Sequence, residues 1–217
     1  MNPLGLLLGV FLLAFVFALV QVGALTIAFD KLGLSSGSAM LLLELTGRQR
    51  INLPLFTLDA EGELDPRWRQ RQLWMNPLMR QIRASKVLVA MNVGGGLVPV
   101  FFSGYLLSRS ALPLTAVVLA TALQSLVCYL FSRPIRGVGI GMPIFIAPIS
   151  AALIAVTVLP EASAPLAYIC GTMGVLVGAD LMRLRDVGRL GAPLASIGGA
   201  GTFDGVFITG IVAVLLA

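Results

Sequence analysis

The sequence predicts an all-α, polytopic membrane protein that crosses the bilayer about seven times. Of its 217 residues, 58% are hydrophobic and 12% are charged, and the mean hydropathy is +0.96. Soluble domains average about half apolar and about a quarter charged residues. Several apolar runs exceed the roughly 18 residues that identify a membrane span. We therefore expect a single transmembrane domain over residues 1–217, with membrane lipid as its main partner.

Composition excludes several kinds of site. The sequence has no histidine, which removes imidazole metal ligands and histidine-based catalytic triads. Cys128 and Cys170 stand in apolar segments and are too few for a disulfide framework. No phosphate-binding loop or haem-attachment motif occurs, so we expect no metal and no cofactor. The net charge of +5 comes mainly from basic loops between spans, so it does not indicate nucleic-acid binding.

Two elements are predicted before residue 57, and the sequence pattern defines the first better than the second. Residues 3–29 form an apolar run longer than the hydrophobic region of a signal peptide, which predicts a retained first helix. Residues 33–56 begin with a potential N-cap serine and are interrupted by the polar stretch GRQR. This part is either a short second span or a re-entrant segment, and the sequence leaves both open.

Residues 57–86 are polar, with acidic residues first and basic residues after them. Trp68 and Trp74 are spaced among arginines along the basic part. This mixture predicts an amphipathic segment on the cytoplasmic membrane surface, with an ordinary basic loop as the alternative.

The remaining spans are expected in five apolar blocks, at 87–107, 112–131, 138–159, 166–184 and 193–217. Glycine and proline interrupt two of them, in NVGGGLVPV and in GVGIGMPIFIAP. Such interruptions indicate either simple kinks or the substrate and ion sites of transporters. Basic residues alternate between the loops, which places the basic ones in the cytoplasm. The location in a prokaryotic inner membrane is what the family resemblance given below implies.

Two aspartates stand in stretches that otherwise look membrane-buried. If both spans are helical, Asp180 and Asp204 lie roughly 20 Å from the outer ends of antiparallel helices, and so at one depth. Carboxylates at such depth are costly and usually functional. Two of them in a dry site share a proton, a state suited to activating water or carrying protons.

Structural roles are the alternative for both aspartates. Asp180 could pair with Arg183, and Asp204 could cap the last helix. The neighbouring glycines either break that helix or allow close packing. The expected supporting or binding residues are Asn92, Pro148, Gly198, Gly199, Gly201 and Gly205.

Six stretches carry a family resemblance, namely VQVGALTIAFDKLGLS, INLPLF, NVGGGLVPV, GVGIGMPIFIAP, AYICGTMGVLVGADL and SIGGAGTFDGVF. They resemble a family of uncharacterised bacterial and archaeal membrane proteins. More remotely, the order of Asp180 and Asp204 resembles that of intramembrane aspartyl proteases of the presenilin and signal-peptide-peptidase type. That resemblance implies a catalytic aspartate pair on adjacent antiparallel helices. The sequence departs from it because GAGTF, rather than Gly-x-Gly, precedes Asp204, and Pro148 is at best a displaced substitute for the Pro-Ala-Leu motif.

Three functions stay open at this point. The first is an intramembrane aspartyl peptidase, in which Asp180 and Asp204 activate water against a transmembrane peptide. The second is a small proton- or cation-coupled transporter, in which Asn92 and the broken helices form the site. The third is a non-catalytic membrane scaffold with structural aspartates. The sequence does not indicate the oligomeric state.

Overall fold

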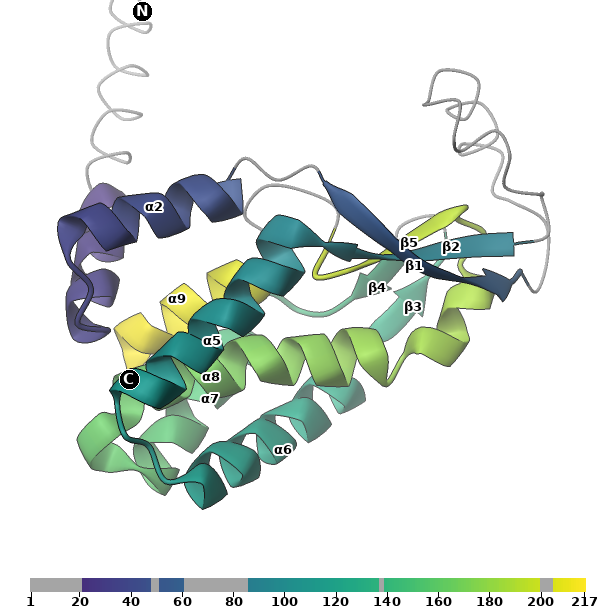
Figure 1. The fold of residues 1–217 in the computed structure, drawn as a ribbon. Helices are drawn as coiled ribbons and strands as arrows, with labels where there is room; N and C mark the ends of the chain where they lie inside the picture. The colour runs from purple at the N-terminus through teal and green to yellow at the C-terminus, as the bar shows by residue number, and fades with distance from the viewer. Residues whose placement is uncertain (1–20, 48–50, 61–85, 137–138, 200–204) are drawn as a thin grey trace, which may run out of the picture.

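The computed structural model describes residues 21–47, 51–60, 86–136, 139–199 and 205–217. Helices form most of this part of the chain, and a small β-sheet lies at one end of them (Figure 1). Residues 21–31 are helical, and the further α-helices are α2 (Ser36–Gly47), α5 (Val98–Arg109), α6 (Leu114–Phe131), α7 (Ile146–Val158), α8 (Ser163–Val175) and α9 (Gly205–Leu216).

Shorter elements connect these helices. Two segments are π-helical, η1 (Val93–Leu97) and η3 (Leu176–Leu181), and two are 3₁₀-helical, η2 (Pro160–Ala162) and η4 (Leu184–Arg189). The strands are β1 (Asn52–Asp59), β2 (Lys86–Asn92), β3 (Arg133–Ile135), β4 (Gly139–Gly141) and β5 (Leu194–Ile197). The mainly helical character is confirmed, but the expectation of an all-α protein is wrong for these strands.

Three of the predicted spans have a strand at or near their start. The block 87–107 starts with β2, the block 138–159 contains β4, and the block 193–217 contains β5. A short apolar run does not distinguish a buried strand from a buried helix by periodicity alone. In the described residues, two helices are long and apolar enough to cross a membrane, Leu114–Phe131 and Pro160–Leu181. The expected seven spans are therefore not confirmed.

The N-terminal third also differs from expectation. Residues 33–56 contain α2 and most of β1, so they are not one continuous span. The predicted amphipathic segment 57–86 begins inside β1 and ends at the start of β2. Its centre, with Trp68 and Trp74, lies outside the described residues, so the surface-helix interpretation stays a prediction.

The three-stranded sheet joins distant parts of the chain. Its order is β1-β2-β5, with β1 antiparallel and β5 parallel to the central strand β2. Val87, Val89 and Ala90 of β2 are at most 1% exposed, so this strand forms the buried centre of the sheet. After β2 and β5 the chain runs through glycine-rich segments toward α5 and α9.

The glycine-rich segments after the two parallel strands pack backbone against backbone. Gly198 and Gly199 have φ angles of +80° and +78°, a region that side chains beyond glycine rarely adopt. A Cβ atom added to Gly198 would lie 2.5 Å from the backbone nitrogen of Gly96. The turn after β5 therefore rests directly on η1, with no room for a side chain between them.

Helix α8 lies in the middle of the helical layer and contacts α5, α6, α7 and α9 (Figure 1). Small residues permit these contacts. A Cβ atom at Gly178 would collide with the carbonyl of Ser125 on α6, and one at Gly174 would collide with the side chain of Gln124. Close backbone approach through small residues is typical of helix packing in membranes.

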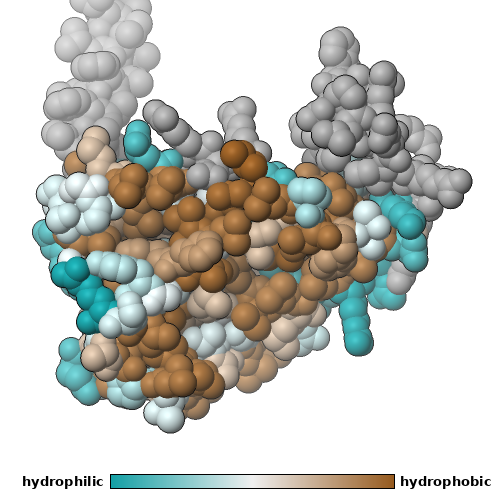
Figure 2. All heavy atoms as spheres, in the orientation of Figure 1, coloured by the Kyte–Doolittle hydropathy of each residue, from teal (hydrophilic) through white to brown (hydrophobic). Residues whose placement is uncertain are grey.

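Helix α6 buries small and polar residues and exposes large apolar ones, which is the opposite of an amphipathic helix in a soluble protein. Its buried residues are small or polar, namely Val117, Ala120, Gln124, Ser125 and Cys128. Its exposed positions hold large apolar residues, namely Leu114, Val118, Leu119, Leu123, Leu126, Leu130 and Phe131. Figure 2 shows hydrophobic residues over much of the helical surface. A helix in water instead places its apolar stripe inward and its polar face outward.

The polar groups that α6 buries have partners. The Gln124 Nε2 donates to the carbonyl of Ala147 at 2.9 Å, and the Ser150 hydroxyl donates to Gln124 Oε1 at 2.9 Å. Both partners lie on α7, so this amide fixes α6 against α7. A buried amide with both ends bonded stabilises the packing, whereas an unbonded one would cost about 1–3 kcal/mol.

Two basic side chains cap helix C-termini. Arg183 Nη2 donates to the carbonyls of Tyr129 and Ser132, both at 2.9 Å, at the end of α6. Lys31 Nζ donates to the carbonyls of Val214 and Leu215, both at 3.3 Å, near the end of α9. The last carbonyls of a helix have no partner within it, so cations at this end satisfy them.

Gly198→Ala should lower the free energy of unfolding by about 2–4 kcal/mol, because it adds strain at a positive φ and a collision with the η1 backbone. Thermal unfolding of the purified protein in detergent measures this change. Gly104→Ala on α5 is the control, since a Cβ there meets nothing within 4 Å. Equal unfolding temperatures for the two variants would contradict the contact between the glycine-rich segments.

Candidate functional site

Asp180 lies at the junction between α8 and the sheet. It belongs to η3, which continues α8 toward β5. Its Oδ2 accepts a hydrogen bond from the backbone N–H of Gly198 at 2.7 Å. The side chain is half-buried. The carboxylate thus connects the end of α8 to the glycine turn that follows β5.

A cavity of about 590 Å³ opens beside Asp180. Its walls come from residues 139–144, from η3 and η4, from β5, and from the first turns of α9. Among the described residues of this lining, Asp180 is the charged one, and most of the others are apolar. An apolar cavity with a few polar groups is the usual form of a ligand site.

Asp204 lies outside the described residues, as does Gly201. The residues on either side of this segment, Gly199 and Gly205, both line the cavity. The distance between the two aspartates stays a prediction.

The helices α8 and α9 run antiparallel. At one end, the Ser163 hydroxyl of α8 donates to the carbonyl of Ala217, after α9. At the other end, Asp180 and Gly205 line the same cavity. The start of α9 and the end of η3 are therefore at a common level.

An ion pair with Arg183 was the structural role considered for Asp180, and the two side chains do not form it. Arg183 instead pairs with Asp186 at 3.2 Å, while its other donors bind the end of α6. Asp180 Oδ2 accepts from the backbone N–H of Gly198. A substitution of Arg183 would therefore remove hydrogen bonds at the end of α6 and not the hydrogen bond of Asp180.

A polar cluster stands behind the cavity, at the end of the sheet. Asn92 Nδ2 donates to Asn52 Oδ1 at 3.2 Å, and the Ser196 hydroxyl approaches the same oxygen at 2.6 Å. The Ser196 hydroxyl also lies within bonding distance of the Gly199 carbonyl, so its one proton is shared between two acceptors. The cluster ties all three strands to the turn that donates to Asp180.

The expected supporting residues divide into three groups. Gly198 donates to Asp180, and Gly199 and Gly205 line the cavity. Asn92 is fully buried behind the cavity, where its Oδ1 accepts from Gly95 N at 2.7 Å and caps η1. Pro148 is buried within α7 and is not part of the cavity lining.

Sequence reasoning missed Asn52 and Ser196. Asparagine is depleted in strands, so Asn52 within INLPLF was a possible signal once that stretch was assigned as a β-strand. The described residues contain no group of three acidic or cysteine side chains that could hold a metal ion.

The fold and the site together define a mainly helical protein with an aspartate-lined cavity at the junction of its helices and its sheet. Residues 48–216 match the family described as "Protein of unknown function (DUF1614)". The match spans most of the chain, so the protein belongs to this family. No curated protein and no solved structure matches the chain.

Asn52→Ala and Ser196→Ala should each lower the free energy of unfolding by about 1–2 kcal/mol, because each removes a hydrogen bond of the cluster. The double variant should lose less than the sum, since both changes remove the same bond. A double-mutant cycle from denaturation in detergent measures a coupling of about 0.5–2 kcal/mol. Additive losses would contradict a shared Asn52 oxygen.

Proposed function

We propose that this protein is an integral membrane peptidase that uses Asp180 and Asp204 as its catalytic pair. The observation that carries the proposal is the position of the Asp180 carboxylate in the wall of a mainly apolar cavity where α8 and α9 meet. Asp204 directly precedes Gly205 of that wall. Two carboxylates beside one cavity can share a proton, one taking a proton from water while the other donates to the substrate.

The surface of the helices supports a membrane location. Large apolar residues cover the outer side of α6, whereas its Gln124 and Ser125 are buried. α6 has 18 residues and is about 27 Å long, close to the roughly 30 Å of a hydrocarbon core. α9 has 12 residues and is about 18 Å long, so it begins inside this thickness if its other end reaches the surface. That geometry would put the cavity below the membrane surface.

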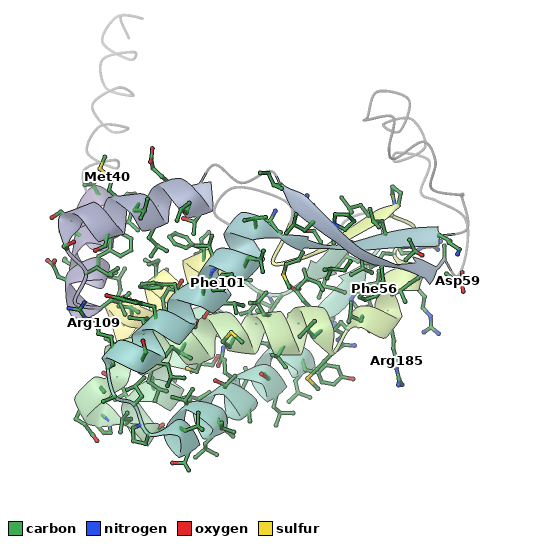
Figure 3. All side chains as sticks on the ribbon, in the orientation of Figure 1. Met40, Phe56, Asp59, Phe101, Arg109 and Arg185 are labelled. Atoms are coloured by element: carbon green, nitrogen blue, oxygen red, sulfur yellow. The ribbon has the colours of Figure 1, made fainter. Side chains whose placement is uncertain are left out.

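The charges at the two ends support one orientation. Figure 3 shows Arg185 and Asp59 at the end that carries the sheet, and Arg109 at the opposite end. The exposed basic residues at the sheet end also include Arg133, Arg136 and Arg189. Because basic residues favour the cytoplasmic side, the sheet and the mouth of the cavity would face the cytoplasm.

A proton- or cation-coupled carrier is the second candidate. Buried hydroxyl groups continue from the cavity into the bundle, where Ser103 Oγ lies 3.1 Å from Thr172 Oγ1. Thr209 lines the cavity, and its methyl group would lie 3.4 Å from a Cβ added to Gly171, the residue before Thr172. Such a row of polar groups between helices is also typical of ion pathways.

Cysteines introduced at Arg185 and Glu161 should label from opposite sides of the membrane. Both positions are exposed, whereas Cys128 and Cys170 are buried and give little background. In intact cells, an impermeant maleimide should label the variant at Glu161 and leave the variant at Arg185 unlabelled until the cells are opened. The reverse result means an inverted protein, and labelling of both sites in intact cells contradicts a membrane-spanning bundle.

Asp180→Asn and Asp204→Asn should each abolish peptide cleavage, because neither variant retains a carboxylate pair. Asparagine is nearly isosteric and can still accept from Gly198, so unfolding temperatures should change little. Purified protein in nanodiscs is incubated with single-span apolar peptides, and the products are identified by mass spectrometry. Asp59→Asn is the matched control, since Asp59 is exposed on β1 outside the cavity lining.

Three outcomes would remove the peptidase proposal. Cleavage that survives in either cavity variant excludes the aspartate pair as the catalyst. Proton-coupled uptake that both variants abolish, without any cleavage, favours the carrier. Unfolding of both variants, with no activity in the original protein, favours a scaffold with structural aspartates.

A further inference from the structure

The cavity runs along the edge of β5. All four residues of this strand, Leu194–Ile197, belong to the cavity lining. Successive side chains of a strand point to opposite faces, so a cavity on one face would meet only every second residue. Contact with four consecutive residues places the cavity beside the strand. Within the described residues β5 is an edge strand, since its pairing partner is β2 alone.

The hydrogen-bonding groups of β5 alternate between this edge and β2. Leu88 N donates to the carbonyl of Pro193 at 2.9 Å, which directs residue 193 toward β2. In a parallel pair the residues that bond to the neighbour are every second one. Leu194 and Ser196 therefore turn their main-chain groups toward the other edge, along the cavity. The Ser196 carbonyl there accepts from Gly199 N at 3.3 Å, which leaves the Ser196 N–H and both main-chain groups of Leu194 for a further partner. Main-chain N–H and C=O groups in an apolar site require partners.

Thr209 places a further polar group in the cavity. It is 4% exposed and belongs to the cavity lining. Thr172, which is also buried, bonds to the carbonyl of Tyr168 on its own helix at 2.8 Å. A hydroxyl in the wall of an apolar cavity can donate a hydrogen bond to a bound ligand or accept one from it.

We propose that the cavity binds an extended polypeptide segment as an additional strand along the free edge of β5, with the Thr209 hydroxyl bonded to that segment. Strand addition pairs alternating N–H and C=O groups, and this edge presents the N–H and C=O of Leu194 and the N–H of Ser196. A lipid acyl chain could fill the apolar volume but would leave these groups unpaired. The peptide as ligand rests on the proposed function, whereas its extended conformation rests on β5 and Thr209.

The wall of the cavity indicates the route of entry. Ile144 and Ile208 both line the cavity, yet they are 75% and 40% exposed. The cavity is therefore bordered by the same kind of apolar surface that covers α6. A segment from the membrane can reach β5 past these residues without crossing a charged barrier.

This binding mode selects against helical segments. The main-chain groups of an α-helix already bond to one another, so a helix has none to offer to a strand edge. A transmembrane segment must unwind locally before it binds, and glycine and proline lower the cost of unwinding. The same unwinding exposes the peptide bond beside Asp180.

The test compares two apolar probe peptides of equal length in nanodiscs that contain the full chain. One peptide has a central Gly-Pro pair, and the other is rich in alanine and leucine and helical. Amide hydrogen exchange is measured at Leu194 and Ser196, with Ala195 and Ile197 as internal controls that already face β2. The Gly-Pro peptide should slow exchange at Leu194 and Ser196 about tenfold or more and leave the controls unchanged.

Variants of Thr209 test the second contact. Thr209→Val removes the hydroxyl at nearly constant volume and should weaken binding of the Gly-Pro peptide about fivefold, whereas Thr209→Ser should bind like the original protein. Thr157→Val is the matched control, because Thr157 is exposed and its hydroxyl bonds to a carbonyl of its own helix, α7. Equal affinity for Thr209→Val and the original protein would remove Thr209 from the proposal.

The strand-addition proposal is overturned if neither peptide changes exchange at Leu194 and Ser196, or if the helical peptide or the lipid alone protects them equally. Its failure is distinguishable from failure of the peptidase proposal. Aspartate-dependent cleavage with unchanged exchange removes strand addition and keeps the peptidase. Selective protection of Leu194 and Ser196 without any cleavage keeps strand addition and removes the peptidase.

Discussion

The contact between two glycine-rich segments holds the rest of the arrangement together. Gly198 rests on the backbone of Gly95 and Gly96, and a side chain at this point would separate β5 from η1. The same turn donates to Asp180 and begins the connection to α9. The end of α8, the sheet and the start of α9 therefore meet at one place, and the cavity exists because these elements cannot approach more closely.

The interior of the bundle is polar in places. Polar side chains such as Gln124 and Ser103 bond to neighbouring helices, an arrangement that an apolar surrounding favours. Large apolar side chains cover the outside of α6, and small residues inside allow its contact with α8 and η3. One set of contacts thus satisfies both the hydrogen bonds and the packing of the helices.

Sequence reasoning found the helices better than the strands. The long run of α6 was predicted at 112–131 and observed at Leu114–Phe131, because its hydrophobic length exceeds that of any short strand. β2 and β5 were absorbed into predicted spans because they are short, apolar and continuous with helices. Asp180 was found from its unusual place in an apolar run. Asn52 and Ser196 were not, because their importance arises from pairing between strands far apart in the sequence.

The pairing of β2 with β5 has a consequence for assembly of the protein during synthesis. Leu88 and its partner Leu194 are more than a hundred residues apart in the sequence. The separation is still larger between Lys31 and the residues whose carbonyls it binds, Val214 and Leu215. These contacts can therefore form only after the final segment has been made. Closure of such long loops is the slow kind of step in folding. The cavity wall is accordingly completed last, when β5 and α9 join the earlier helices.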